Sequence, residues 1–204
     1  MDVYKKKQKN IVDKSSESNY AGDAWVYTAI KRGTYFIIAF SIGKHNTQTC
    51  RELMNILFDT IDLPFPENKI VISTDGNDQY ETCLRENYAD TCIDYGQLIK
   101  IRKKGRVVEK KKRIIIGNPD LNDIETTDVE NANGIFRERV GRLVRKTKCF
   151  SKVTNKLEHA IVVFQFYWNF INLFNDNKTP AMLEDIVEQP DTWEIFLNTA
   201  IKYV

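Results

Sequence analysis

Glu130, Asn133 and Arg137 recur at steps of three and four residues, which places them on one face of any helix that contains them. We predict such a helix over residues 128–152, with a carboxylate near its start and basic residues along the rest. The carboxylate would hold a metal ion, and the guanidinium groups would hold a phosphate backbone beside it. The alternative is a surface helix with ordinary salt bridges, which this stretch taken alone favours.

A second carboxylate stands in a position where ligands often bind. Asp75 directly follows a short apolar run, residues 69–74, that predicts a strand. In open α/β sheets, ligands bind at the carboxyl ends of the strands. If Asp75 and Glu130 share one site, their repulsion requires a cation between them, and Mg²⁺ or Mn²⁺ suits such oxygen ligands. Two such ions would activate an attacking water or 3′-hydroxyl and stabilise the leaving oxygen.

Apolar periodicity and turn residues predict the elements that must position these side chains. Strands are expected over 25–31 and 35–42 as a hairpin around Arg32-Gly33-Thr34, and over 69–74, 95–103 and 113–116. Helices are expected over 47–62 with Asn46 or Thr47 as cap, over 77–87, over 128–152, from Ser151 to about Phe174, and around 193–203. This order predicts an α/β domain with a mixed central sheet flanked by helices, similar to a ribonuclease H-like fold. We expect the domain to span residues 1–177, with a truncated first strand and a helical tail over 178–204.

Composition is that of a soluble globular protein. The chain has 204 residues, enough for one domain with or without an appendage. No run of about 18 apolar residues predicts a membrane span, and no signal peptide precedes the lysine-rich start. The four cysteines are scattered and do not form a zinc pattern. We therefore expect a cytoplasmic, nucleoid-associated protein with reduced thiols.

The charge is unevenly distributed although the formal net charge is only +2. Between Lys100 and Arg113, nine of fourteen residues are Lys or Arg, against a single Glu. This run is either a solvated surface segment or a loop that tracks a phosphate backbone.

Several ordered motifs resemble the DDE transposases of bacterial and archaeal insertion sequences, of the InsB type, over nearly the full chain. They are G-D-A-W-V-Y-T-A-I from Gly22, T-D-G from Thr74, G-N-P-D from Gly117, E-x-x-N-x-x-x-R from Glu130, F-S-K from Phe150 and T-P-A-M from Thr179. The resemblance implies that Asp75 and Glu130 are the second and third acids of a metal-binding triad. It also implies that basic and amide side chains of the same region contact DNA, namely Asn133, Arg137, Arg142, Arg145, Lys146 and Lys152.

The family carries its first catalytic Asp in a D-E-x-W segment on the first strand. Val3-Tyr4-Lys5-Lys6 resembles the family's strand end just beyond that segment, so we expect the chain to begin directly after it. Neither Asp2 nor Asp23 aligns with the missing acid, although Asp23 would lie near the site if its strand adjoins that of Asp75. The family's N-terminal DNA-binding module is likewise expected to be absent.

Three other positions bear on the resemblance. Asn172 and Phe174 stand where the family tends to have Arg and His. His159, on the predicted helix after Ser151, is expected in the core or behind the ligands rather than as a ligand, and His45 is given no role.

The resemblance implies metal-dependent DNA cleavage and strand transfer on double-stranded DNA by a homo-oligomer. One alternative is a DNA-binding regulator or decayed remnant with an incomplete triad, which would bind DNA without turnover. A more remote alternative is a ribonuclease H-like nuclease, which would cleave RNA–DNA hybrids.

Overall fold

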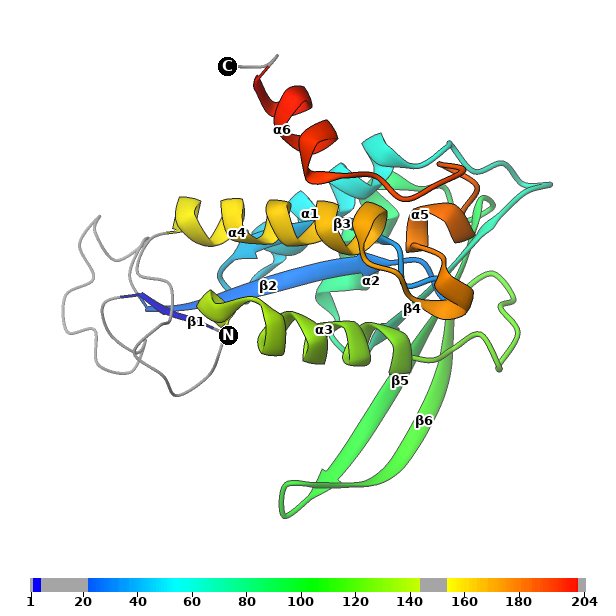
Figure 1. Ribbon diagram of the computed structural model, residues 1–204. Coiled ribbons are helices and arrows are strands. Elements are labelled where there is room, and N and C mark those ends of the chain that lie inside the picture. Colours follow the sequence, from blue (N-terminus) through cyan, green and yellow to red (C-terminus); the bar gives the residue numbers. More distant parts are fainter. Residues whose placement is uncertain (1, 5–21, 144–153, 202–204) are drawn as a thin grey trace.

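The computed structural model describes residues 2–4, 22–143 and 154–201 (Figure 1). The strands are β1 (Asp2–Tyr4), β2 (Gly22–Ile30), β3 (Ile37–Gly43), β4 (Ile70–Asp75), β5 (Ile93–Lys103) and β6 (Arg106–Ile116). The α-helices are α1 (Thr47–Thr60), α2 (Gln79–Asn87), α3 (Thr127–Arg139), α4 (Thr154–Phe166), α5 (Pro180–Leu183) and α6 (Trp193–Ile201). Short helical segments are the 3₁₀ turns η3 (Gly141–Leu143) and η5 (Asn175–Asn177) and the π-helical η4 (Tyr167–Ile171).

The strands form two three-stranded sheets within the described residues. The first has the order β1-β2-β3 and is antiparallel, while the second has the order β4-β5-β6 and is mixed. The predicted α/β class is therefore confirmed, but one continuous central sheet was predicted and two separate sheets are found. In particular, β2 and β4 belong to different sheets, so no hydrogen-bonded strand pair joins Asp23 to Asp75.

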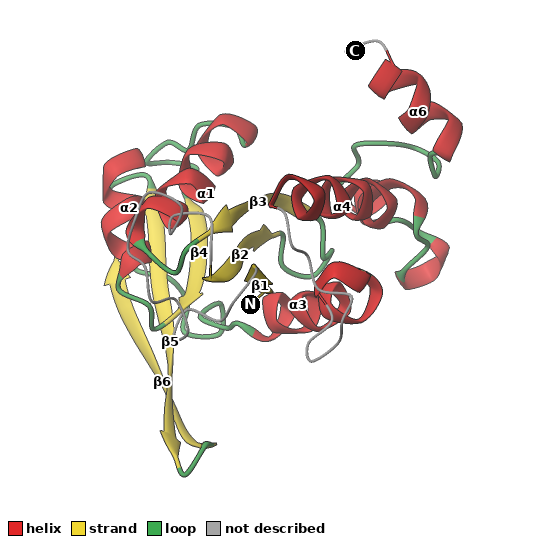
Figure 2. Ribbon diagram, turned by 90° about the vertical axis from the view of Figure 1, so that its left-hand side faces the viewer, coloured by secondary structure: helices red, strands yellow, loops and turns green. Residues whose placement is uncertain are grey.

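Helices cover both sides of the sheets, which gives three layers (Figure 2). On one side α1 and α2 pack in a core that includes Tyr27, Leu53, Leu84 and Tyr95. On the other side α3 and α4 pack in a second core centred on aromatic and branched side chains, including Ile37, Phe136, Leu157, Ile161 and Trp168. Each helix thus buries one apolar stripe against a sheet face.

Local sequence signals explain the well-predicted elements. Asn46 caps α1, because its side-chain oxygen accepts a hydrogen bond of 3.0 Å from the backbone N–H of Thr49. The predicted hairpin is confirmed as β2 and β3, which pair in antiparallel register around the turn that contains Gly33 at φ +82°. Asp75 is the last residue of β4, one position beyond the predicted strand.

The predicted helix over 128–152 is wrong in its extent. Helix α3 ends at Arg139, and Val140 has an extended backbone with φ −92° and ψ 97°. Gly141 then opens the short turn η3, consistent with the low helix propensity of glycine. Residues 144–153, including Ser151, lie outside the described residues, and the described part of the next helix begins at Thr154.

The basic run also differs from the prediction of a loop. It forms the end of β5 and most of β6, an eleven-residue strand rather than the predicted four-residue one. Lys104 and Gly105 make the connection, with φ of 48° and 79°. Positive φ at both central positions is typical of the type I′ turns that join tight hairpins.

Helix α6 packs against the end of α4 and η4 through aromatic rings. The Trp193 and Tyr167 rings stack with centroids 5.9 Å apart, and those of Phe166 and Phe196 lie 4.7 Å apart. None of the described helices is long and apolar enough to cross a membrane.

Candidate metal and nucleic-acid site

Asp75 lies at the carboxyl end of β4 and is exposed to solvent. Its Oδ1 accepts a 3.2 Å hydrogen bond from the backbone N–H of Asn77, which fixes the turn that leads into α2. Asn77 is held in turn, because its Oδ1 accepts from the N–H of Gln79 at 3.1 Å. The turn thus orders the backbone around Asp75 while one carboxylate oxygen has no partner among the described hydrogen bonds.

Glu130 lies in the first turn of α3, where the positive end of the helix dipole favours a carboxylate. Its Oε1 accepts a hydrogen bond of 2.6 Å from the Thr126 hydroxyl and forms an ion pair with Lys100 of β5. Partial burial acts to raise the pKa of Glu130, but the bonds from Lys100 and Thr126 outweigh it and hold that pKa below its ordinary value. Glu130 is therefore a carboxylate at neutral pH.

Strand register relates the two acids. Asp75 pairs with Leu98 across the parallel β4–β5 ladder, and Lys100 stands two residues further along β5. Because side chains alternate along a strand, Asp75 and Lys100 lie on the same face of the sheet. Their Cα atoms are separated by roughly 8 Å, from a strand spacing of about 4.8 Å and a rise of about 3.3 Å per residue. Lys100 reaches Glu130 on that face, so Asp75 and Glu130 face the same side of the sheet.

The chemistry of these donors fits a hard divalent cation. Carboxylate oxygens are preferred ligands of Mg²⁺, which keeps waters or phosphates at its other positions. In the described part of the chain, no group of three or more His, Cys, Asp and Glu side chains could hold a metal ion. Asp75 and Glu130 are candidate ligands whose oxygens could hold such an ion, and the Lys100 ammonium provides positive charge beside Glu130.

The other predicted site residues are distributed more widely. Asn133, half-buried on α3, accepts a hydrogen bond of 3.3 Å from the Thr28 hydroxyl of β2. Arg137 is exposed near the end of α3. Arg142 was predicted to continue the helical stripe, but it lies in η3 and is half-buried. Arg145, Lys146 and Lys152 lie outside the described residues.

Positions where the chain departs from the family motif have contacts within the protein. Asn172 Oδ1 accepts hydrogen bonds from Tyr167 at 3.0 Å and from Arg139 at 3.3 Å. The Phe174 ring packs on Tyr35 with centroids 5.2 Å apart. His159 is exposed, so its expected place in the core is wrong.

Sequence reasoning gave no role to His45, which lies beside the Asp75 turn. Its ring is 4.5 Å from that of Trp25 and 6.0 Å from that of Tyr27, centroid to centroid. Its Nε2 lies 3.5 Å from Asn77 Nδ2. The signal that could have found it is its place in the loop between β3 and α1, which the fold brings to the end of β4.

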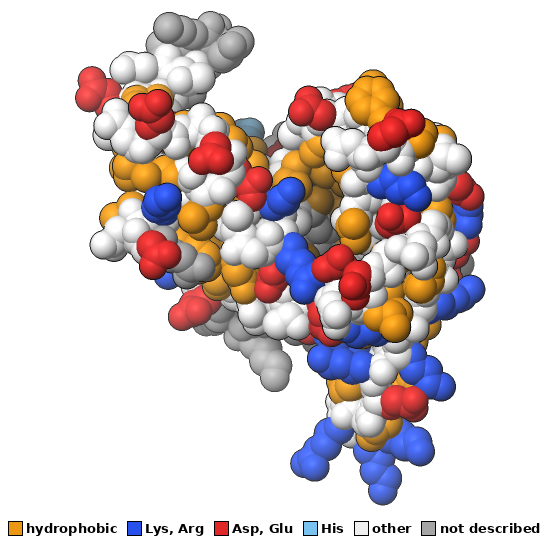
Figure 3. Space-filling model, turned by 90° about the vertical axis from the view of Figure 1, so that its right-hand side faces the viewer, with side chains coloured by type: hydrophobic (Ala, Val, Ile, Leu, Met, Phe, Trp, Pro, Cys, Tyr) orange, Lys and Arg blue, Asp and Glu red, His pale blue; other side chains and the backbone are white. Residues whose placement is uncertain are grey.

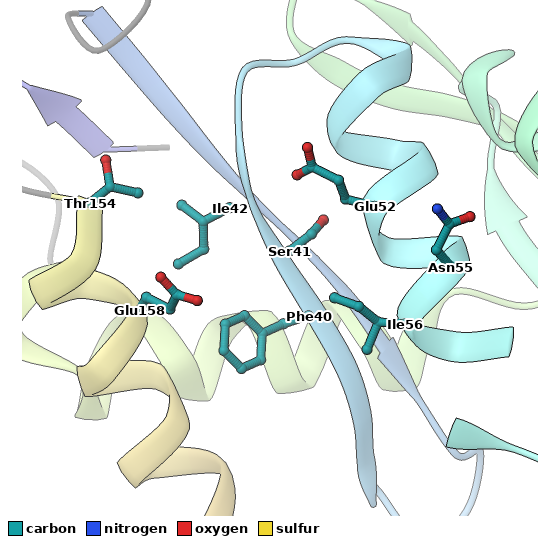
Figure 4. Close-up of a pocket in the computed structure, with 8 residues that line it drawn as sticks. All are labelled: Phe40, Ser41, Ile42, Glu52, Asn55, Ile56, Thr154 and Glu158. Carbon is teal, nitrogen blue, oxygen red and sulfur yellow. The ribbon is translucent and has the colours of Figure 1, made fainter. Parts of the chain in front are cut away.

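Surface hollows of the described residues bear on the location of the site, and two are compared with the positions of Asp75 and Glu130. One, of about 490 Å³, is lined by Glu130 together with Tyr35, Asn131, Gly134, Ile135, Glu138 and Phe174. The other, of about 450 Å³, lies between α1, β3 and α4 (Figure 4), where Ser41, Glu52 and Glu158 accompany apolar side chains. The first includes one of the two acids, whereas the second includes neither.

Comparison with known proteins finds a distant similarity. The chain is similar to an insertion-element protein. It is 27% identical over 140 residues to the insertion element iso-IS1n protein InsB of Shigella dysenteriae, covering 69% of this chain and 79% of that protein. No protein-family model matches the chain, and no solved structure matches it. The similarity agrees with the InsB-type resemblance of the motifs and supports a relationship to insertion-sequence proteins.

Proposed function

We propose that the chain is the catalytic part of an insertion-sequence transposase of the DDE type, with a ribonuclease H-like arrangement of its domain. The observation that supports this proposal is that Asp75 and Lys100 lie on the same face of the sheet, where Lys100 forms an ion pair with Glu130. The similarity to an InsB protein supports it from the sequence. The proposed reaction is cleavage of double-stranded DNA and transfer of a 3′ end to a second DNA site.

Each side chain has a defined part in this proposal. Asp75 and Glu130 hold Mg²⁺ or Mn²⁺ as anionic oxygen ligands, as the second and third acids of the triad, and the motif resemblance implies a first Asp in a D-E-x-W segment. When bound, such ions supply Lewis-acid stabilisation of the attacking and leaving oxygens. Arg137 offers its guanidinium to the DNA backbone, and Asn133 positions α3 against β2 through Thr28.

The test is a strand-transfer assay with isosteric variants. The donor is a duplex that ends in the inverted repeat flanking the gene, and the target is a plasmid. Asp75→Asn and Glu130→Gln remove a charge each with little change in shape, so each is expected to abolish transfer and leave DNA affinity nearly unchanged. Asp78→Asn and Glu67→Gln, at surface positions, are the charge-matched controls and should retain the activity.

Three results would count against the proposal. Full activity in either site variant would refute the assigned acids. Salt-dependent DNA binding without transfer by the unsubstituted chain would favour the regulatory alternative. Cleavage of RNA–DNA hybrids without strand transfer would favour a nuclease.

A further inference from the structure

The ends of β5 and β6 form a two-stranded ribbon that projects from the body of the molecule (Figure 1). Beyond Leu98, which pairs with the last residue of β4, the described partner of β5 is β6. At about 3.4 Å per residue, the remaining five residues carry the ribbon roughly 17 Å past β4. We call this segment, residues 99–111 with the turn at Lys104-Gly105, the basic ribbon.

Cations dominate the surface of the basic ribbon and its base, as the protruding part of Figure 3 shows. Lys100, Lys111 and Lys112 have carboxylate partners, namely Glu130, Glu109 and Glu125. Within the described residues, no ion pair involves the other cations of the two strands, which are Arg102, Lys103, Lys104, Arg106, Lys110 and Arg113. The ribbon therefore presents a concentration of positive charge that the carboxylates around it neutralise only in part.

The pairing of the strands adds a second observation. Lys103 stands directly opposite Arg106, and Lys100 stands opposite Lys110. Like charges at opposed positions destabilise a β-ladder. A bound polyanion would remove this repulsion by placing negative charge between the opposed side chains.

We propose that the basic ribbon is a duplex-DNA-binding element that lies in the major groove, with its cations on the flanking phosphates. The major groove of B-form DNA, about 12 Å wide, admits a two-stranded β-ribbon, whereas that of duplex RNA is deep and narrow. Exposed Val107 and Val108, 41% and 53% accessible, provide apolar surface for base edges between the cations.

The ribbon also connects with the candidate metal site. Lys110 pairs directly with Lys100, so the two side chains lie on the same face, the face that Glu130 occupies. DNA bound along that face would run from the tip of the ribbon towards Asp75 and Glu130. This part of the inference rests on the proposed function, while DNA binding by the ribbon does not.

The test measures binding of the full chain to a fluorescent 25-base-pair DNA duplex in EDTA, over a series of salt concentrations. Arg102→Gln, Lys104→Gln and Arg106→Gln are combined in one ribbon variant. Losing three phosphate contacts should reduce the slope of log affinity against log salt by about 2–3 and weaken binding at 0.1 M salt on the order of a hundredfold. Because the cations repel one another, the variant is expected to keep its thermal stability.

Two matched proteins serve as controls. Lys31→Gln, Lys156→Gln and Lys178→Gln remove the same charge from positions elsewhere on the surface and should change the slope by less than about one. Arg102→Lys, Lys104→Arg and Arg106→Lys keep the charge of the ribbon and should keep the slope. An unchanged slope in the ribbon variant, or equal competition by duplex RNA and duplex DNA, would overturn the proposal.

A second measurement uses only the unsubstituted chain, so it tests DNA binding by the ribbon even if the ribbon variant does not fold. Lysines of the unsubstituted chain are labelled with an amine-reactive ester with and without DNA, and the sites are read by mass spectrometry. DNA should protect Lys103, Lys104 and Lys110 more than Lys31, Lys156 and Lys178, and equal protection would overturn the proposal. Neither measurement uses a metal ion or DNA cleavage, so both are independent of the proposed catalysis. If the ribbon binds DNA but the chain transfers no strand, the proposed catalysis is refuted and the proposal for the ribbon is not.

Discussion

Replacing Lys100 by methionine should remove the pH dependence that the Lys100–Glu130 ion pair adds to stability. The Lys100 side chain is 17% exposed and that of Glu130 is 51% exposed, so solvent screens the pair and its free energy is about 0.2–1 kcal/mol. Because the pKa of Glu130 is lowered in the folded chain, this stabilisation is present above the ordinary value of 4.5. It is lost as the pH falls through the folded pKa.

Lys100 also stands opposite Lys110 in the β5–β6 ladder, and the two positive charges repel each other. Replacing Lys100 by methionine removes this repulsion as well. Lysine stays charged at acidic and neutral pH, so this second effect is the same at pH 7 and pH 2.5. The substitution changes the free energy of unfolding at each pH, and the difference between these two changes comes from the ionised Glu130 carboxylate alone. This difference should be about 0.2–1 kcal/mol.

Urea unfolding of both proteins at pH 7 and pH 2.5 measures this difference. Lys103→Met, on the same strand at an exposed position, should change stability equally at the two pH values. If Lys100→Met also shows the same change at both pH values, the ion pair does not stabilise the folded chain and the reasoning fails.

Two further predictions concern the scaffold. Gly117 has φ +65°, and a Cβ at this position would collide with Asp94 Oδ1. Gly117→Ala should therefore lower the free energy of unfolding, measured in urea, by at least about 1–2 kcal/mol. A substitution without effect on stability would contradict the described turn. Asn169 is buried, its Oδ1 accepts from the Ile37 N–H at 2.9 Å and its Nδ2 donates to the Ile37 carbonyl at 2.9 Å. Asn169→Leu leaves the Ile37 N–H without a partner, while the Ile37 carbonyl keeps its hydrogen bond from Gln165 at 2.9 Å. The substitution should therefore cost about 1–3 kcal/mol, and a loss under about 0.5 kcal/mol would show that this contact is absent in solution.

Short-range signals predicted much of the secondary structure. The Asn46 cap, the turn at Gly33 and the regular apolar spacing of α1 act within a few residues, so the sequence reveals them directly. The end of α3 was missed because the basic residues beyond Arg139 were read as one continuous helix. Gly141 was the available sign of the break.

The basic ribbon was missed for a different reason. Lysine has low strand propensity, and charged side chains at successive positions hide the apolar–polar alternation of a strand, so residues 100–113 resembled a loop. The structure shows that the Lys104-Gly105 turn and the pairing with β5 determine this segment. Lys104-Gly105 was the local signal that the sequence offered.

The candidate site was predicted in part. Asp75 and Glu130 were singled out from their motifs. The register of β4 with β5 and the Lys100–Glu130 ion pair put them on one side of the sheet, and their role as metal ligands stays a prediction. The ion pair of Glu130 with Lys100 joins residues thirty positions apart and depends on where α3, which packs on β2, lies relative to β5, and no local pattern specifies this. His45 reaches the Asp75 turn through the same kind of long-range packing.

The central claim, that Asp75 and Glu130 hold one divalent-cation site, is tested most directly by iron-mediated backbone cleavage. Fe²⁺ replaces Mg²⁺ in the DNA-bound chain, ascorbate and peroxide generate hydroxyl radicals at the metal, and the cuts are mapped by mass spectrometry. We expect cuts beside both residue 75 and residue 130, and the loss of both sets in Asp75→Asn and in Glu130→Gln. Cuts beside only one of these residues, or cuts that persist in either variant, would contradict it.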